Sequence, residues 1–563
     1  MSSFNHNKYQ SFKPIEIVNR QWPDQVISKA PLWCSVDLRD GNQALIEPMS
    51  VEQKKVLWAL LVKVGFKEIE VGFPAASQPD FDFVRWLIEE NQIPDDVTIQ
   101  VLTQARPALI ERSFAALKGA KRAVVHLYNS TSTVQREQVF KLDRAGIIDI
   151  AVKGTQCVKA LAQANPETQW TFQYSPESFT GTELDFAVEI CDAVVATWQP
   201  TAQDKVILNL PATVEMSTPN VYADQIEWFI NHVAQRENVI ISLHTHNDRG
   251  CGVAAAELGV MAGADRIEGT LLGNGERTGN MDVVTMAMNL YSQGIDPELD
   301  FSNIDEVVQV VKACTQLPVH PRHPYAGELV FTAFSGSHQD AIKKCLALRQ
   351  PDDIWNVAYL PIDPTDLGRD YQEVIRINSQ SGKGGIAWIL ERELGVQLPR
   401  WAQIEFSAVV QKTAEVTGAE VSASQISELF KTTYLSTSGP YVLGDYHIER
   451  KQSDHVKAKL EYQGQEATTA VEVEGIGRGA LDAFVNGLQQ QTGLTIDVID
   501  FAEHAMTSGA EAEAITYLLV KVEDTRVLGV AVHQDIMTAS LDAVLTALNI
   551  YTAQQVAEVA VAG

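Results

Sequence analysis

Apolar strand-like runs and amphipathic helical stretches alternate through the first half of the chain. Each apolar run is short and is followed by residues whose apolar positions recur with the spacing of one helix face. The strand-like runs lie at residues 32–38, 68–73, 98–103, 122–128, 171–176, 205–211, 239–245 and 266–272. The longest helical interval, residues 134–164, predicts two helices. Eight alternating units predict a closed (β/α)8 (TIM) barrel, with a doubly wound sheet as the structural alternative.

The pattern changes after the last barrel helix. A Pro-rich segment at residues 317–324 breaks it, and residues 325–435 then mix short helical patterns with turn signals. Further on, three strand-like runs followed by one helical pattern occur twice, at 441–450, 455–463, 467–474 and 479–491, and at 494–502, 513–523, 526–533 and 539–554. The sequence therefore predicts an N-terminal arm (1–30), the barrel (31–324), a mixed α/β linker region (325–435) and an α+β domain of duplicated βββα units (436–563).

The composition is that of an ordinary globular protein, with 45% hydrophobic and 21% charged residues. The net charge of -28 argues against nucleic acid and anionic membranes as partners, and an anionic substrate needs a local positive site. No run approaches the roughly 20 apolar residues of a membrane span, and the N-terminal residues have no apolar signal region. The six cysteines form no C-x-x-C pair. We therefore expect reduced thiols in a cytoplasmic protein without nucleic-acid or membrane partners.

Polar residues that can carry out chemistry follow the ends of six predicted strands. They are Asp37, Arg39 and Asp40, then His126, Ser175 with Glu177, Thr213 with Glu215, His244 with His246, and the loop at 273–280. In a (β/α)8 barrel, the carboxyl ends of the strands form the active-site face. So many polar residues at these ends are hard to explain by stability, and the sequence predicts an enzyme.

His244 and His246 indicate the kind of site. They stand one residue apart at the end of a predicted strand, so both imidazoles project to the same face. Neutral imidazole is the commonest protein ligand for a divalent metal; a pair of structural histidines is the alternative. Together with Asp40, the two histidines form a carboxylate and imidazole set that leaves metal positions open. An ion bound in this way can polarise a carbonyl group.

Two reaction classes are compatible with these residues. Arg39, next to Asp40, can stabilise negative charge on an oxygen, and Glu177 or a histidine can remove a proton. One class is carbon–carbon bond chemistry on a keto acid, and the other is metal-assisted hydrolysis with a bound water. The glycines at 273 and 275 do not favour dinucleotide binding, because the G-x-G-x-x-G spacing fails and the turn follows the last strand.

Several motifs carry a resemblance to a known family. The segments 38–43 (LRDGNQ), 244–248 (HTHND) and 273–280 (GNGERTGN) resemble the Claisen-condensing, metal-dependent barrel enzymes. The segments 174–177, 210–215, 335–341 and 359–364 are further similar to the long-chain 2-isopropylmalate synthases, from about residue 30 to the C-terminus. Citramalate and homocitrate synthases share the first motifs and are the alternative. Asn42 departs from the pattern, since many relatives carry Glu there.

The resemblance implies a reaction and the residues for it. Acetyl-CoA condenses with 2-oxoisovalerate (3-methyl-2-oxobutanoate), and thioester hydrolysis yields (2S)-2-isopropylmalate and CoA, the first committed step of leucine biosynthesis; the enzyme is an acyltransferase. The implied metal ligands are Asp40, His244, His246 and Asn280, for Mg²⁺, Mn²⁺ or Zn²⁺, with K⁺ as an activator. The implied substrate-binding residues are Arg39, His126, Ser175 and Thr213, and the implied catalytic residues are Arg39, Glu177, His338 and Tyr359.

The implied catalytic pair has a structural consequence. The acetyl methyl group is a weak carbon acid, so it needs a positioned base, and the resemblance pairs Glu177 with His338 for this purpose. His338 lies outside the barrel, in the linker region, and the family implies a domain-swapped homodimer in which it reaches the partner's barrel. The resemblance also implies that Tyr359 assists thioester hydrolysis. Simpler roles remain open for three residues: Thr213 as the end of a strand, Tyr359 as a packed tyrosine and Asn280 as a helix N-cap.

The last domain is similar to the leucine-binding feedback domain of this family. No catalytic cluster occurs in it, which indicates a binding or regulatory module, and the resemblance implies that it binds leucine as an allosteric inhibitor. Gly475, Gly477 and Gly479 are the candidate regulatory residues, because glycines let backbone N–H groups approach a small anion. Arg478 departs from the smaller residue of relatives. A metal hydrolase, which needs no acetyl-CoA, and a leucine sensor without turnover are the competing functions.

Overall fold

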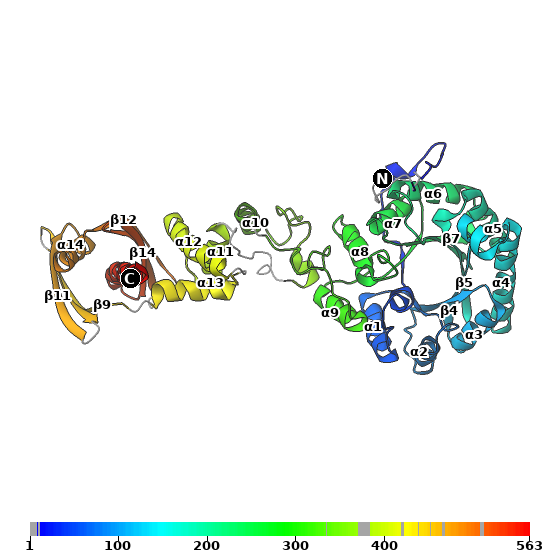
Figure 1. Cartoon of the computed structure of the whole chain (residues 1–563), viewed down its shortest axis with the longest axis horizontal. Helices are drawn as coiled ribbons and strands as arrows, with labels where there is room; N and C mark the ends of the chain where they lie inside the picture. The colour runs from blue at the N-terminus through cyan, green and yellow to red at the C-terminus, as the bar shows by residue number, and fades with distance from the viewer. Residues whose placement is uncertain are drawn as a thin grey trace. The chain divides into compact units, whose positions relative to one another are not determined.

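Eight parallel strands close into a barrel in the order β1 to β8, and helices surround it (Figure 1). The strands are β1 (Leu32–Ser35), β2 (Glu68–Gly72), β3 (Thr98–Gln104), β4 (Arg122–Ser130), β5 (Gln169–Glu177), β6 (Val206–Ala212), β7 (Val239–Thr245) and β8 (Arg266–Gly269). The helices are α1 (Val51–Val64), α2 (Gln78–Glu89), α3 (Pro107–Leu117), α4 (Arg144–Ala164), α5 (Leu184–Trp198), α6 (Pro219–His232), α7 (Gly252–Met261) and α8 (Val283–Tyr291). Since β1 pairs with both β2 and β8, the predicted (β/α)8 barrel is confirmed and the open-sheet alternative is wrong.

This computed structural model describes residues 8, 12–333, 335–369, 383–417, 421–436, 439–450, 452–463, 468–506 and 512–562. The chain divides into two units, one of residues 1–330 and 362–369 and the other of residues 331–361 and 370–563. The domain limits expected from the sequence stay predictions.

Two local details of the barrel differ from or refine the sequence pattern. The strand expected at 32–38 ends at Ser35, and a π-helical turn, η3 (Asp37–Gly41), follows it. The turn forms because the backbone N–H groups of residues 39, 40 and 41 all donate to the carbonyl oxygen of Val36. The interval 134–164 contains a π-helical turn, η4 (Gln135–Phe140), and then α4, in agreement with the two predicted helices.

Side chains along each strand alternate between the helix layer and the barrel interior. In β2, Ile69 and Val71 alternate with Glu70, and all three are fully buried. In β8, Ile267 likewise alternates with Arg266 and Glu268. The interior of this barrel is therefore lined in part by buried charged groups, which matter for the site described below.

The N-terminal arm contacts the outside of the barrel. Arg20 forms two hydrogen bonds to the Asp224 carboxylate on α6, at 2.6 and 2.8 Å, and the Trp22 indole donates to the same carboxylate at 2.7 Å. Gln21 donates its backbone N–H to Glu227 at 2.7 Å. These bonds hold the arm against α6.

The described part of the region between barrel and C-terminal domain is mainly helical. Its elements are α9 (Ile304–Thr315), α10 (Gly336–Leu348), the 3-10 turn η8 (Pro364–Leu367), α11 (Lys383–Leu394), α12 (Arg400–Thr417), α13 (Ala423–Phe430) and the π-helical turn η10 (Lys431–Leu435). An isolated β-bridge in this region links Val357 to Leu360.

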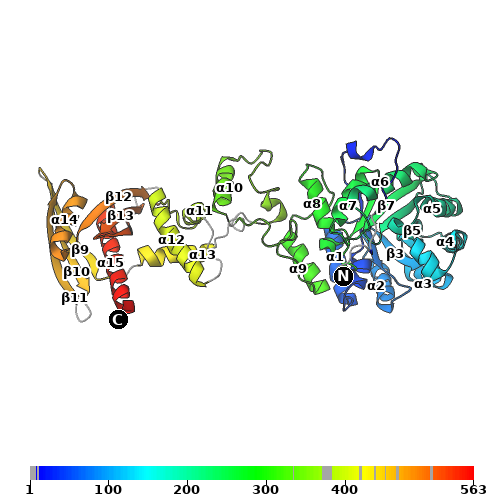
Figure 2. The ribbon, with the colours of Figure 1, turned by 45° about the horizontal axis from the view of Figure 1, so that its top comes forward.

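The C-terminal domain repeats one unit twice. Its elements are β9 (Tyr441–Arg450), β10 (Asp454–Gln463), β11 (Thr468–Gly477) and α14 (Ala480–Thr492), then β12 (Ile496–Ala505), β13 (Ala514–Val522), β14 (Thr525–His533) and α15 (Ile536–Ala562). Each group of strands forms one antiparallel sheet, β11-β10-β9 and β12-β13-β14 (Figure 2). One apolar core joins both sheets and both helices, with Val456, Phe484, Leu518 and Val544 among its members. The duplicated βββα order predicted from the sequence is confirmed.

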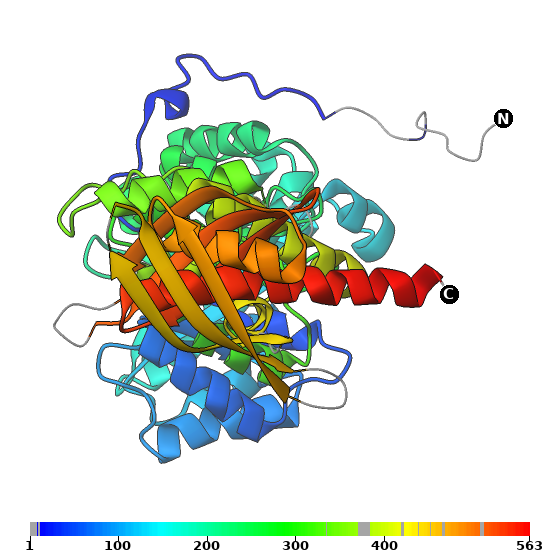
Figure 3. The same ribbon diagram turned by 90° about the vertical axis from the view of Figure 1, so that its left-hand side faces the viewer.

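The last helix, α15, is long and apolar enough to cross a membrane. Within the described residues, only its segment Ile536–Val556 has the length and hydropathy of a membrane span, and 56% of its most apolar stretch is buried in the fold. Figure 3 shows α15 in red beside the strands of the C-terminal sheets. Its Leu541, Val544 and Leu548 lie in the domain core. We therefore interpret α15 as a core helix.

Candidate active site

The two histidines of β7 lie side by side, as their spacing predicts. His244 is near the end of the strand, and His246 follows it and pairs with Asn280 in an isolated β-bridge. The two ring centroids are 5.1 Å apart, and both side chains are buried. The strand thus presents two imidazoles on one face, at the carboxyl end of the barrel.

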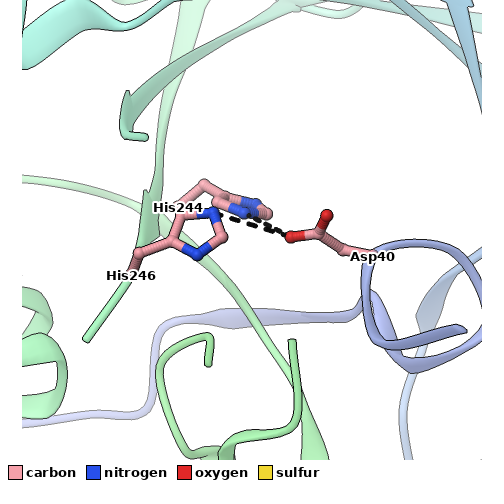
Figure 4. Close-up of side chains that lie close together, drawn as sticks. All are labelled: Asp40, His244 and His246. Carbon is pink, nitrogen blue, oxygen red and sulfur yellow. Dashed lines mark hydrogen bonds and ion pairs between the residues drawn. The ribbon is translucent and has the colours of Figure 1, made fainter. Parts of the chain in front are cut away.

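The turn η3 brings a carboxylate to the same place. Asp40 Oδ2 lies 3.1 Å from His244 Nε2 and 3.7 Å from His246 Nε2 (Figure 4). One ligand atom from each of the three residues lies within 4.8 Å of the others. The early end of β1 is responsible for this geometry, since the turn that replaces the strand carries Asp40.

The electrostatics of the cluster favour a cation. Burial alone would raise the pKa of Asp40, but the Arg39 guanidinium and the His244 hydrogen bond outweigh it and hold that pKa well below its usual range. Burial would lower the pKa of His244, but hydrogen bonds to Asp40 and Glu268 raise it to about 9. The two carboxylates attract positive charge at this imidazole. Burial lowers the pKa of His246 to about 4, which leaves a neutral ring with a free lone pair.

Buried polar atoms without hydrogen-bond partners indicate that the cluster of Asp40, His244 and His246 can bind a ligand. Among the described residues, His246 Nδ1 and both amide atoms of Asn280 are buried without a hydrogen-bond partner. Buried polar atoms normally have partners, so these atoms are placed to meet something further. A carboxylate, two imidazoles and an amide oxygen fit a divalent cation with open positions. The N-cap alternative for Asn280 is wrong, because Asp282 caps α8.

A chain of hydrogen bonds connects Arg39 to the neighbouring strands. Arg39 Nε donates to Glu70 Oε1, and Glu70 Oε2 lies 2.7 Å from His126 Nδ1. The other ring nitrogen, His126 Nε2, lies 2.7 Å from Ser175 Oγ. Burial alone would lower the pKa of Arg39, but Asp40 and Glu70 outweigh this effect and raise that pKa above its usual value, so the guanidinium stays charged. The chain fixes the orientation of three residues predicted from the sequence.

A second buried carboxylate, that of Glu268, orients the His244 imidazole through its Nδ1 atom. Its Oε2 lies 2.8 Å from His244 Nδ1, and its Oε1 accepts hydrogen bonds from Arg266 at 2.8 Å and from Gln173 at 2.7 Å. Metal-binding histidines commonly donate their other ring N–H to such a carboxylate. Arg266 is fully buried and also donates to Gln100 at 3.0 Å. Because Gln173 and Gln100 belong to strands that do not adjoin β8, these bonds cross the barrel interior.

Hydrophobic periodicity alone does not reveal this layer of supporting residues. Glu70, Arg266 and Glu268 lie inside apolar runs that were assigned as strands from their hydrophobicity. A charged residue within a buried strand is itself a signal, since such residues are almost never fully buried unless paired. That signal identifies all three residues.

A cavity of about 240 Å³ opens above the cluster at the barrel mouth. Its walls are formed by Arg39, Asp40, Gln43, Phe73, Leu102, His126, Tyr128, Ser175, Glu177, Asn209, Pro211, Thr213, His244, His246, Glu276 and Arg277. All the barrel residues predicted for substrate binding or catalysis, and three of the four proposed metal ligands, thus lie around one cavity. The fourth proposed ligand, Asn280, adjoins it through its pairing with His246.

Two residues of the cavity wall come from the ends of β5 and β6. Glu177, the last residue of β5, accepts a hydrogen bond from the Ser130 hydroxyl with its Oε2. Thr213 follows β6, and its Oγ1 accepts the backbone N–H of Ser178 at 2.9 Å. Thr213 therefore also ties the β6 end to the β5 loop, and its own hydroxyl hydrogen remains available to a ligand.

The two predicted catalytic residues outside the barrel occur together in the other unit. The rings of His338 and Tyr359 are stacked, with centroids 3.9 Å apart and an interplanar angle of 23°. His338 belongs to α10, and Tyr359 is 60% exposed with a backbone φ of 66°. The two predicted residues are therefore in direct contact.

The three candidate regulatory glycines lie at the junction of β11 and α14. A Cβ at Gly475 would come within 2.0 Å of the Ala483 carbonyl oxygen, and one at Gly477 within 2.4 Å of the Ala483 nitrogen. Gly479 has open space around it. The glycines at 475 and 477 thus permit close packing of the strand on its own helix, and Gly529 contacts Ala543 in the same way in the second repeat.

Three family models match successive parts of the chain. Residues 30–311 match the HMGL-like family model, residues 328–391 the alpha-isopropylmalate synthase post-catalytic domain-like model, and residues 420–552 the LeuA allosteric (dimerisation) domain model. Among solved structures, the HMG-CoA lyase from Brucella melitensis aligns with a TM-score of 0.41 and 16% identity, covering 52% of this chain and 100% of that one.

Curated relatives match over almost the whole length. The 2-isopropylmalate synthase of Pseudomonas putida (strain W619) is 56% identical over 554 residues, which cover 98% of both chains. That of Rhodospirillum rubrum is 55% identical over 546 residues, covering 96% of this chain and 98% of the relative. The barrel with its site, the region after it and the C-terminal module are all included in these matches, and the chain belongs to the 2-isopropylmalate synthase family.

Proposed function

We propose that the chain condenses acetyl-CoA with 2-oxoisovalerate and hydrolyses the thioester, giving (2S)-2-isopropylmalate and CoA. The observation that carries this proposal is the cluster of Asp40, His244 and His246 in a cavity that also contains Arg39 and Glu177. The curated relatives bear the name of this activity. The chain is then an acyltransferase of leucine biosynthesis.

In this proposal the polar side of the cavity binds the keto acid. Arg39, His126, Ser175 and Thr213 contact its keto and carboxylate oxygens, and the charge of Arg39 compensates the anion in a strongly acidic protein. Asp40, His244, His246 and Asn280 hold a divalent cation, Mg²⁺, Mn²⁺ or Zn²⁺, with K⁺ as an activator. When bound, that cation supplies a Lewis acid for the keto group. Phe73, Leu102 and Pro211 offer an apolar wall suited to a branched side chain.

The proton transfers are assigned to Glu177 and His338. This pair removes a proton from the acetyl methyl group, whose carbon then bonds to the keto carbon. The keto oxygen becomes an alkoxide beside Arg39 and takes that proton to form the hydroxyl group of the product. Water then adds to the thioester carbonyl, and the CoA thiol leaves. Tyr359, stacked on His338, assists this hydrolysis. His338 and Tyr359 act on the partner's barrel in a domain-swapped homodimer, formed with the linker region 325–435.

The first prediction concerns the acceptor. In a panel of 2-oxo acids, followed by release of free CoA, 2-oxoisovalerate is expected to give the highest kcat/KM, because the apolar wall matches its isopropyl group. A higher value for pyruvate would favour a citramalate synthase, and a higher value for 2-oxoglutarate a homocitrate synthase. Turnover of a substrate without acetyl-CoA would instead identify a metal hydrolase.

The second prediction concerns the support of His244. Glu268→Gln keeps the shape of the side chain but removes the charge that His244 and Arg266 contact. Loss of such a supporting partner typically lowers metal affinity about 10- to 100-fold. Isothermal titration calorimetry with Zn²⁺ or Mn²⁺ on the metal-free protein measures this. The exposed Glu298→Gln serves as the control, and equal affinities in both variants would reject the role of Glu268.

The third prediction concerns regulation by the C-terminal domain (436–563). Leucine is expected to inhibit the intact chain without competing with 2-oxoisovalerate, and to lose its effect on a chain that ends at Ser436. The match to an allosteric (dimerisation) domain model supports this. Coupling between two sites is reciprocal, so the keto acid must change leucine affinity by the same factor. Equal inhibition of both chains would assign leucine to the barrel, and no inhibition at all would contradict a leucine-responsive domain.

We also propose a cytoplasmic location. All six cysteines are free thiols, and burial raises the pKa of the Cys34 and Cys191 thiols well above the ordinary value. Such cysteines are protonated and unreactive, as expected in a reducing compartment.

A further inference from the structure

A lysine is buried in the wall of the barrel, away from the cavity. Lys54 of α1 has no exposed surface, and its Nζ donates to Asp80 Oδ1 at 2.5 Å and to the Leu38 carbonyl oxygen at 3.1 Å. Leu38 lies in the turn η3, directly before Arg39 and Asp40. The ammonium group therefore holds the backbone of the turn that carries two residues of the site.

Its partner Asp80 holds a second loop. Asp80 lies in the first turn of α2 and accepts the backbone N–H of Phe73 with its Oδ2 at 2.7 Å. Phe73 begins the loop after β2 and forms part of the cavity wall. A Cβ at Gly72 would meet the same carboxylate at 2.8 Å, so a glycine at this position is what lets Asp80 approach the backbone.

We propose that Lys54 and Asp80 are positioning residues that fix the loops after β1 and β2 relative to each other at the active site. The inference rests on the proposed condensation for its kinetic test. Neither residue lines the cavity, so neither contacts the substrate. They act through Leu38 and Phe73, and thereby on Arg39, Asp40 and the apolar wall.

The stability of the fold alone does not explain why this ion pair is buried. Removing two charges from water is costly, and replacing a buried ion pair by uncharged residues of similar volume is often neutral or stabilising. Here each charged group also contacts one backbone group of an active-site loop. An uncharged, well-packed replacement keeps the helices together but loses the ammonium group that binds the Leu38 carbonyl and holds the Asp80 side chain, which is the difference that an experiment can measure.

The test compares single variants with a double variant. Lys54→Met or Asp80→Asn alone leaves one charge buried without its partner, and each is expected to lower Tm clearly. The double variant Lys54→Met/Asp80→Asn removes both charges but keeps an acceptor for Phe73 N–H, so its Tm is expected to recover most of that loss. Its kcat/KM for 2-oxoisovalerate is nevertheless expected to be about 10- to 100-fold lower, since small misplacement of catalytic groups has effects of this size. A purely structural pair predicts that activity recovers together with Tm.

A second variant and a control keep the result decisive. Gly72→Ala leaves both charges in place but displaces the Asp80 carboxylate and strains the backbone at a φ of 155°, and it is expected to lower kcat/KM as well. Lys63→Met removes an exposed ion pair of the same helix, to Glu306 at 2.6 Å, and is expected to change nothing. Wild-type kcat/KM in the double variant overturns the proposal, and if that variant does not fold, wild-type kcat/KM in Gly72→Ala overturns it.

A third measurement separates this proposal from the proposed reaction. The affinity of the metal-free protein for Mn²⁺ needs no substrate, and the double variant is expected to bind Mn²⁺ more weakly because Asp40 shares the turn held by Lys54. If the unaltered chain does not turn over acetyl-CoA, the proposed function fails, and the Mn²⁺ affinity then decides the role of the pair alone. Equal affinity in the unaltered chain and the double variant would then overturn it.

Discussion

Asp40→Ala is expected to lower the turnover of acetyl-CoA and 2-oxoisovalerate by at least about 10³-fold. The variant loses the carboxylate that lies within 3.7 Å of both imidazole Nε2 atoms, and a divalent ion would keep only uncharged ligands there. A Lewis-acid metal contributes several kcal/mol to a barrier, and each 1.36 kcal/mol is about tenfold in rate. Activity and bound metal, measured by elemental analysis of the same sample, are expected to fall together.

The control removes a carboxylate of the same type far from the site. Asp149→Ala on α4 breaks an exposed ion pair with Lys153 and is expected to retain full activity and metal content. Stoichiometric metal together with normal activity in Asp40→Ala would exclude Asp40 as a ligand. Loss of activity with normal metal content would transfer its role to the orientation of Arg39, to which its Oδ1 is bonded.

Glu177→Gln and His338→Ala are each expected to lower kcat about 10²- to 10⁴-fold with little change in keto-acid affinity, the usual range for a positioned base. The change at 177 preserves the size of the side chain and the oxygen that accepts the Ser130 hydroxyl. Glu189→Gln, exposed on α5, is the matched control and should behave as the unaltered chain does. Exchange of deuterium into the acetyl methyl group, without condensation, measures the base directly.

Mixing the two inactive chains tests whether the site is shared between subunits. If His338 of one subunit serves the cavity of the other, a heterodimer of Glu177→Gln and His338→Ala chains contains one complete site and is expected to regain a fraction of the activity. Heterodimers that form, as judged by co-purification of two different affinity tags, but stay inactive would assign both residues to one chain.

The sequence predicted the barrel well because its signal is repeated. Eight apolar runs alternate with helical patterns, so an error of a few residues at one element does not change the closed order β1 to β8. The two histidines of the site could be predicted for a related reason. His244 and His246 depend only on the two-residue period of a strand, and that period leads directly to their shared face.

What the sequence missed depends on contacts between distant segments. β1 ends at Ser35 because three backbone N–H groups donate to the Val36 carbonyl oxygen, and no pattern of side chains predicts this end. The support of His244 by Glu268 needs the register of the neighbouring strands β7 and β8, and the support of Arg39 by Glu70 needs the position of the turn after β1 relative to β2. Hydrophobic periodicity says which face a residue occupies, but it does not say which residue of another strand meets it.

The buried polar residues of the barrel interior also tie assembly of the site to closure of the ring. They come from every strand between β2 and β8: Glu70, Gln100, His126, Gln173, Asn209, His244, and Arg266 with Glu268. A partly assembled sheet would leave charged groups such as Arg266 and Glu268 in an apolar setting without partners, which is strongly unfavourable. Folding intermediates that lack a strand are thus destabilised by the same residues that position the catalytic groups. Cooperative folding of the barrel and correct assembly of the active site therefore depend on one set of residues.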